Sequence, residues 1–175
     1  KGKMIYFYNI WQPLFENFME EFPSMVFVQG LHLGKIEDFQ NEENFVNVVI
    51  CDDLMDSAVK DENFAKLFTV YGHHRNILNF FVTQNPYFQV SMSTTLNRNA
   101  HYYVLMKTPH LNTISVLNSQ LYGGSGPLKN AYIHAMKEQK YSHLLVDVFN
   151  DTLENRLRSN IFQENSIPLI IWRAT

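Results

Sequence analysis

The stretch VNVVICDDLM, residues 46–55, decides which fold the rest of the sequence can adopt. Four of its first six residues are Val or Ile, and a short β-branched run that ends in turn or helix signals is typical of a strand buried on both faces. Asp52 and Asp53 follow directly, and adjacent carboxylates at the end of such a strand repel each other and resist desolvation. A metal ion or a hydroxyl-bearing ligand would relieve both effects. We therefore expect ligand chemistry where this strand ends, because ligands of open α/β sheets lie outside the carboxyl ends of the strands.

The paired acids allow two interpretations. A buried strand that ends in Asp52 and Asp53 has the pattern of a Walker B strand of a P-loop NTPase. There the first acid holds Mg²⁺ through water and the second polarises the attacking water. The alternative is that one of the two acids caps the helix that follows, because Asp is a favoured N-cap residue. The stretch alone leaves both open.

The composition is that of a folded globular protein. The chain has 175 residues, of which 46% are hydrophobic, and this is enough for one domain with a good core. A net charge of −3 argues against a basic, histone-like DNA coat but not against a local basic loop. The lone cysteine, Cys51, lies in the apolar strand, where a small core hydrophobe is the favoured interpretation, and it suggests a reducing compartment. We expect no membrane segment and no signal peptide.

The residues after Asp53 predict a parallel βαβ unit. Apolar residues at helical spacing occupy residues 54–68, and ILNFFV at residues 77–82 is typical of a second buried strand. Sequential parallel strands usually neighbour each other, so the acids and the polar residues 83–85 should lie at the same edge of one sheet. Gln84 could orient a water between a γ-phosphate and a carboxylate there. The alternative is that Gln84 or Asn85 hydrogen-bonds the local backbone in a turn.

Apolar runs and turn signals predict further elements on both sides of this unit. Upstream of it, two strands and the helix between them are expected at residues 3–9, 25–29 and 13–22. Downstream of it, the pattern predicts a loop at residues 86–99, helices at 111–122 and 127–139, and strands at 101–107, 142–149, 155–162 and 167–172.

Three other polar features of the sequence could carry chemistry. The run GGSG at residues 123–126 lacks the Gly-Lys-Ser/Thr ending of a phosphate loop and lies between two expected helices, so a flexible turn is favoured. His73 and His74 are neighbours in sequence, a spacing that rarely directs two ligands at one zinc ion. Arg75 beside them is either a surface charge or a residue that reaches a phosphate.

Several motifs in a fixed order carry a resemblance to one family. The central motifs are VVICDDLMD (48–56), LFTVYGHHRNI (67–77), FFVTQNPYFQ (80–89) and TTLNRNAHYYVLMKTP (94–109). The outer ones are YFYNIWQPLF (6–15), YSHLLVDVFNDT (141–152) and RLRSNIF (156–162). Together they cover nearly the whole chain. The sequence resembles the HerA/FtsK-class genome-packaging ATPases of Polinton/Maverick elements and related adintovirus-like DNA viruses.

The resemblance implies an α/β fold, a RecA-like P-loop NTPase core with a largely parallel sheet, as one domain over residues 1–175. Carried over by position, Asp52 would be the acid that holds Mg²⁺ through water, Asp53 the acid that activates water, and Gln84 the sensor on the neighbouring strand. Arg75 would contact phosphate within or between subunits, and Arg98 is a candidate DNA contact.

The same resemblance implies ATP and Mg²⁺ as cofactors and an ATP-driven DNA translocase as the function. The partners it implies are double-stranded DNA, capsid or portal components, and further copies of the chain in a ring. The expected location is a reducing intracellular compartment, the host nucleus or cytoplasm, or the virion.

One departure from the family is large. The family begins with a strand and a G-x-x-x-x-G-K-[ST] loop, the Walker A segment, and residues 1–3 are too short to be one. We expect residue 1 to fall downstream of that loop, so that this chain alone holds ATP poorly and is inactive. The alternatives are a non-catalytic relic that acts as a binding or assembly module, and another α/β nucleotide enzyme such as a helicase or nucleotide kinase.

Overall fold

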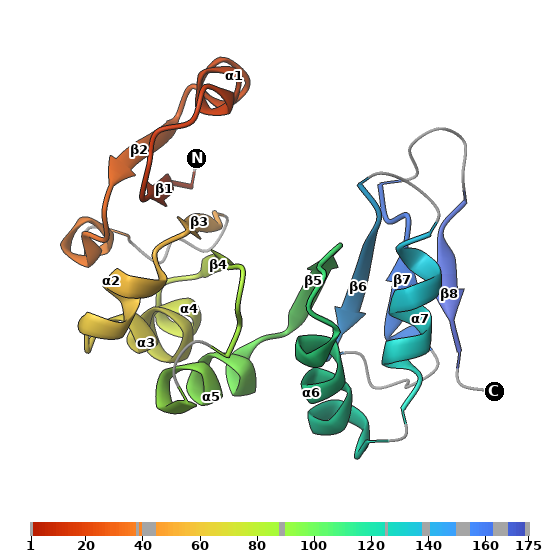
Figure 1. Ribbon diagram of the computed structural model, residues 1–175. Coiled ribbons are helices and arrows are strands. Elements are labelled where there is room, and N and C mark those ends of the chain that lie inside the picture. Colours follow the sequence, from red (N-terminus) through yellow and green to blue (C-terminus); the bar gives the residue numbers. More distant parts are fainter. Residues whose placement is uncertain are drawn as a thin grey trace. The chain divides into compact units, whose positions relative to one another are not determined.

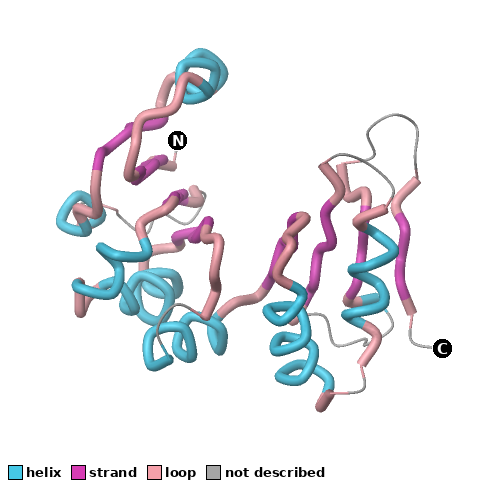
Figure 2. Tube along the Cα trace, in the orientation of Figure 1, coloured by secondary structure: helices cyan, strands magenta, loops and turns pink. Residues whose placement is uncertain are grey.

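The structure is a computed structural model that describes residues 2–37, 39, 45–87, 90–124, 126–137, 141–149, 155–162 and 168–173 (Figures 1 and 2). The sequence led us to expect one domain over residues 1–175. The helices and strands form two compact units, Lys1–Asn99 and Ala100–Thr175. The described part of the chain contains no helix that is long and apolar enough to cross a membrane.

The first unit contains a parallel sheet of four strands in the order β2-β1-β3-β4 (Figure 1). The strands are β1 (Met4–Tyr8), β2 (Met25–Gln29), β3 (Asn47–Asp52) and β4 (Ile77–Val82). All three strand pairs are parallel. The α/β class and the parallel sheet are therefore confirmed for this unit, and β2 and β4 have the bounds that the sequence predicted.

Short helices follow these strands, and all of them except α1 lie on one face of the sheet. They are α1 (Leu14–Glu21), η1 (Leu33–Ile36), α2 (Met55–Lys60), α3 (Phe64–Lys66), η2 (Leu67–Tyr71), α4 (Gly72–His74) and α5 (Val90–Asn99). Phe7, Val49 and Cys51 from the strands pack in one buried cluster with Phe64 and Leu67 from the helices. Since Cys51 is fully buried there, its interpretation as a small core hydrophobe is confirmed.

The opposite face of the parallel sheet is covered only in part. Tyr6 of β1, on this face, is buried and packs on Phe15 of α1, so we call this side of the sheet the α1 face. The register places Ile50 and then Phe80 beside Tyr6 on the same face. The exposed fraction of the side chains rises toward β4, where Phe80 is 47% exposed. Its neighbours on the same face of β4, Leu78 and Val82, are 47% and 51% exposed. The prediction that residues 77–82 form a strand buried on both faces is therefore wrong for the α1 face.

The second unit has an antiparallel sheet in the order β5-β6-β7-β8. Its strands are β5 (Tyr102–Met106), β6 (His143–Asp147), β7 (Leu157–Ser159) and β8 (Ile170–Trp172). Two helices, α6 (Leu111–Tyr122) and α7 (Leu128–Ala135), share a buried cluster with Leu144, Val146 and Leu157 of the sheet. The strands and helices expected here exist, mostly with shorter bounds, but the sheet is antiparallel.

One predicted loop is a helix. Residues 86–99 were expected to form a loop, whereas α5 occupies Val90–Asn99. Its sequence is rich in Ser, Thr and Asn, which are weak helix formers. Leu96 of α5 is buried in the core cluster of the first unit. Packing of this residue outweighs the local preference, because most helical stability in proteins comes from tertiary contacts.

Candidate functional site

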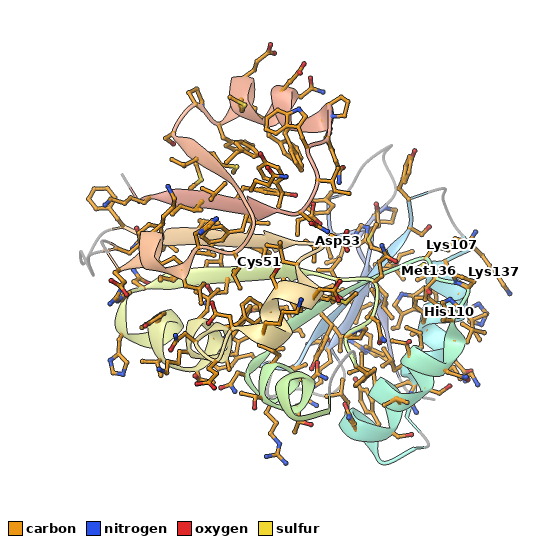
Figure 3. All side chains as sticks on the ribbon, turned by 60° about the vertical axis from the view of Figure 1, so that its left-hand side comes forward. Cys51, Asp53, Lys107, His110, Met136 and Lys137 are labelled. Atoms are coloured by element: carbon orange, nitrogen blue, oxygen red, sulfur yellow. The ribbon has the colours of Figure 1, made fainter. Side chains whose placement is uncertain are left out.

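Strand β3 brings the two acids to the carboxyl edge of the parallel sheet. Figure 3 labels Asp53, the second of them. Asp52 is the last residue of β3 and stands in register with Tyr8 of β1 and Val82 of β4. Asp53 comes next with a φ of +53° and its backbone N–H donates to the Val82 carbonyl at 3.2 Å. Asp is one of the few residue types that accept this left-handed conformation readily. The chain thus turns sharply after the strand and leaves the Asp53 side chain exposed.

Neither acid caps the helix that follows. The N-cap residue of α2 is Leu54, and no side-chain hydrogen bond caps this helix. The capping interpretation of Asp52 and Asp53 is therefore wrong in this fully described segment. Their position at the end of a central parallel strand needs another explanation, and ligand binding is the one that the sequence offered.

Asp52 is held by a residue that sequence reasoning missed. The Tyr6 hydroxyl donates to Asp52 Oδ2 at 2.9 Å from the neighbouring strand β1. Burial raises the pKa of Tyr6 above its usual value, and the hydrogen bond to Asp52 and the charge of that carboxylate raise it further. Tyr6 is therefore a neutral donor to Asp52.

This arrangement predicts a change in the titration of Tyr6. Because a tyrosinate would lose the hydrogen bond and be repelled by the carboxylate, Asp52→Asn is expected to lower the pKa of Tyr6. Base titration followed by ¹³C NMR of the tyrosine ζ carbons measures this, with Tyr6→Phe to assign the signal. The control is Tyr103 of the second unit, whose pKa burial raises to about 12 and which should not respond. An unchanged Tyr6 titration in Asp52→Asn would contradict the contact.

The end of β4 lies at the same edge as the acids. Strands β3 and β4 are parallel neighbours, with Asp52 in register with Val82, which confirms the predicted βαβ arrangement. Gln84 follows two residues later and is exposed, while the Asn85 side chain accepts the Tyr87 N–H at 3.0 Å in a local turn. The turn-bonding alternative thus holds for Asn85. A close approach of the Gln84 amide to an Asp52 or Asp53 carboxylate stays a prediction.

A hydrogen bond joins the segment after β3 to the segment after β4. The Thr83 hydroxyl donates to Met55 Sδ at 2.7 Å, and Met55 is the first residue of α2. The segments that leave β3 and β4 are therefore joined directly after the strands end. This contact restrains the two segments that carry Asp53 and Gln84.

The structure does not bring Arg75 to this edge. Arg75 precedes β4, whose six residues span about 20 Å at about 3.3 Å each. Its Nη1 donates to the Ile36 carbonyl at 2.7 Å, and its guanidinium lies 4.6 Å from the centre of the Tyr71 ring. A phosphate contact by Arg75 thus stays a prediction for an interface between subunits only. Arg98 is exposed in the last turn of α5, where a DNA contact is sterically open.

The oxygen atoms at this edge fit Mg²⁺ better than a softer metal. Carboxylates from Asp52 and Asp53 and the Gln84 amide offer oxygen, the donor that Mg²⁺ prefers. The described residues include no group of three or more His, Cys, Asp or Glu able to hold a metal ion. Mg²⁺ commonly uses one or two carboxylates together with substrate phosphates and waters. In the described part of the chain neither acid is in an ion pair; the pair recorded there joins Arg158 and Asp147.

The Gly-rich run at residues 123–126 is a turn between helices. Gly123 is the C-cap residue of α6 with a φ of +68°, and α7 begins at Leu128. Glycine adopts this left-handed conformation at little cost, which explains its place at the helix end. Ser125 lies outside the described residues. The prediction of a turn between two helices is therefore confirmed for the described part of the run.

A scan against protein-family models and searches of curated proteins and of solved structures found no match to this chain. The role of the edge that carries Asp52, Asp53 and Gln84 therefore depends on the geometry of these residues and on the resemblance of their motifs.

Proposed function

We propose that this chain supplies the acidic part of the ATP site of a DNA translocase, of the genome-packaging kind that its motifs resemble. One observation carries the proposal: Asp52 and Asp53 stand at the end of a central strand of a parallel sheet, and Gln84 follows two residues after the neighbouring parallel strand ends at the same edge. Ligands of open parallel sheets bind at this edge. The site's oxygen donors and the absence of a capping role for the acids both favour it.

In this proposal each residue has a distinct role. Asp52 holds Mg²⁺ through water, and Asp53, exposed beyond the strand, accepts a proton from the attacking water. Gln84 orients that water from the neighbouring strand. Bound Mg²⁺ would neutralise charge that develops on the phosphates. Double-stranded DNA and a ring of subunits belong to the proposal through the resemblance alone.

The partly covered α1 face supports a RecA-like core. Parallel sheets are normally covered on both faces, yet Leu78 and Phe80 of β4 are both 47% exposed. β4 is also an edge strand, with one row of backbone groups unpaired within the sheet. A strand carrying a phosphate loop, followed by its helix, would pair with β4 and cover this face. The phosphate loop would then open at the edge where Asp52 lies.

The proposal predicts that this chain alone does not bind ATP tightly. The chain contains no G-x-x-x-x-G-K-[ST] loop, so the backbone cradle and the lysine that hold phosphates are missing from it. Calorimetry with Mg·ATP should give no saturable isotherm at micromolar concentration. Circular dichroism on the same sample checks that the chain is folded. A clear micromolar isotherm would contradict this expectation, and residues 123–126 would be the first to reconsider.

The partly covered α1 face also favours a second candidate, the non-catalytic relic that acts as an assembly module. The exposed apolar row of Leu78, Phe80 and Val82 on β4 could dock another protein instead of a phosphate-loop helix. The two candidates differ in what Asp53 does. Only the ATPase needs its carboxylate, and an assembly module would tolerate Asp53→Asn.

A further inference from the structure

The Tyr6 hydroxyl extends along the sheet to the carboxyl edge where Asp52 and Asp53 lie, which we call the acid edge. Tyr6 stands in register with Ile50, two residues before Asp52 on the adjacent strand, and on the same α1 face. Its ring nevertheless brings the hydroxyl to 2.9 Å from Asp52 Oδ2. The contact therefore joins the middle of β1 to the end of β3, and it places a fixed donor beside one carboxylate oxygen.

The Tyr6 ring is held rigidly by other aromatic residues. Phe27 of β2 stacks on it with ring centres 5.2 Å apart and planes at 24°, and Phe15 of α1 lies at 5.1 Å. Tyr6 itself is 8% exposed. This packing restricts where the hydroxyl can lie, and the hydrogen bond then favours one orientation of the Asp52 carboxylate.

A neutral donor in this place suits a metal-binding carboxylate. The hydrogen bond occupies part of Oδ2 and leaves Oδ1 with its lone pairs for a ligand. A Lys or Arg would hold the carboxylate equally well but would oppose the charge of a cation. Hydrogen-bond partners that orient ligating groups commonly change metal affinity or activity by about 10- to 100-fold when they are removed.

We propose that Tyr6 is a positioning residue that fixes the Asp52 carboxylate in the orientation that binds Mg²⁺, an inference that rests on the proposed function. Tyr6 touches neither metal nor nucleotide in this role. It acts only through Asp52, and its hydroxyl, not its ring, is the group that matters. The matched substitution is therefore Tyr6→Phe, which keeps the aromatic packing and removes the donor.

The first measurement uses the metal alone and this chain. Mn²⁺, a paramagnetic substitute for Mg²⁺, is titrated in the millimolar range while the broadening of the Asp53 and Leu54 amide signals is followed by NMR. Tyr6→Phe is expected to raise the Mn²⁺ concentration for half-broadening about tenfold. Tyr132→Phe is the control, because this 2% exposed tyrosine also donates a hydroxyl hydrogen bond, to the Met106 carbonyl at 3.0 Å. Its Mn²⁺ titration should match that of the unchanged chain.

The second measurement uses a protein that carries the phosphate loop together with this chain. Tyr6→Phe should raise the Mg²⁺ concentration for half-maximal ATP hydrolysis about tenfold, with a smaller change in kcat at saturating Mg²⁺. A merely structural role would lower the melting temperature and leave the Mg²⁺ dependence alone.

The outcomes separate the two proposals. If the unchanged protein hydrolyses ATP and Tyr6→Phe has the same metal dependence, the inference about Tyr6 is overturned and the proposed function stands. If the unchanged protein does not hydrolyse ATP, the proposed function is overturned. In that case equal Mn²⁺ titrations of the chain with and without Tyr6→Phe overturn the inference as well, and a tenfold difference supports it as a metal site of another kind.

Discussion

Asp53→Asn is expected to remove ATP hydrolysis and leave ATP binding nearly intact, in a protein that carries the phosphate loop together with this chain. An amide cannot accept the proton of the attacking water, and loss of a positioned general base commonly costs 10²- to 10⁴-fold in rate, so about that loss in kcat is expected. The substitution should change the stability of the fold little. Asp53 has a φ of +53°, and Asn accepts this conformation as readily as Asp does.

Two matched variants sharpen the test of Asp53. Asp56→Asn, an exposed acid in the first turn of α2, removes the same charge three residues later and should hydrolyse ATP at the unchanged rate. Asp52→Ala should weaken the Mg²⁺-dependent part of ATP binding, because it removes the metal-holding carboxylate. Steady-state hydrolysis and nucleotide-binding titrations measure these effects. Turnover of Asp53→Asn at the unchanged rate would show that the role assigned to Asp53 is wrong, whereas no hydrolysis by the unchanged protein would favour the assembly module.

The strands of the parallel sheet could be predicted because each one is a short β-branched or aromatic run between clear turn signals. Residues 25–29 and 77–82 match β2 and β4 residue for residue. The acid edge followed from the same pattern, since a parallel βαβ unit fixes which ends of two strands meet. The direction of the strands in the second unit did not follow, because a run such as residues 101–107 looks the same in a parallel and an antiparallel sheet.

The parts of the site that escaped prediction depend on contacts between distant segments. Tyr6 lies in an aromatic run that is typical of a core strand. Its hydrogen bond to Asp52 joins residues 46 positions apart in the sequence. The separation of Arg75 from the acids, by contrast, follows from its place before β4, because the start of a parallel strand lies at the other edge of the sheet. The exposure of Leu78 and Phe80 could not be foreseen, because an apolar run does not reveal which of its faces is covered.

Leu78→Asp is expected to be tolerated in this chain and severely damaging in a protein that also carries the phosphate loop. In this chain Leu78 is 47% exposed on the α1 face, so a carboxylate there stays hydrated and should change the unfolding free energy by about 1 kcal/mol or less. If a phosphate-loop helix covers this face, the same carboxylate is buried without a partner, which costs several kcal/mol (roughly 3–5). ATP binding should then be lost together with stability, because the helix that opens the phosphate loop cannot pack.

The matched control for Leu78→Asp is Val26→Asp at the opposite edge of the same sheet. Val26 of β2 is 52% exposed and lies on the other face, in register with Ile5. It should therefore be tolerated equally in both proteins. Chemical denaturation and nucleotide-binding titrations on the four proteins give the comparison. If Leu78→Asp destabilised both proteins by the same small amount, no helix would cover the α1 face at β4, and the RecA-like core would have to be abandoned while the acid edge of β3 kept its geometry.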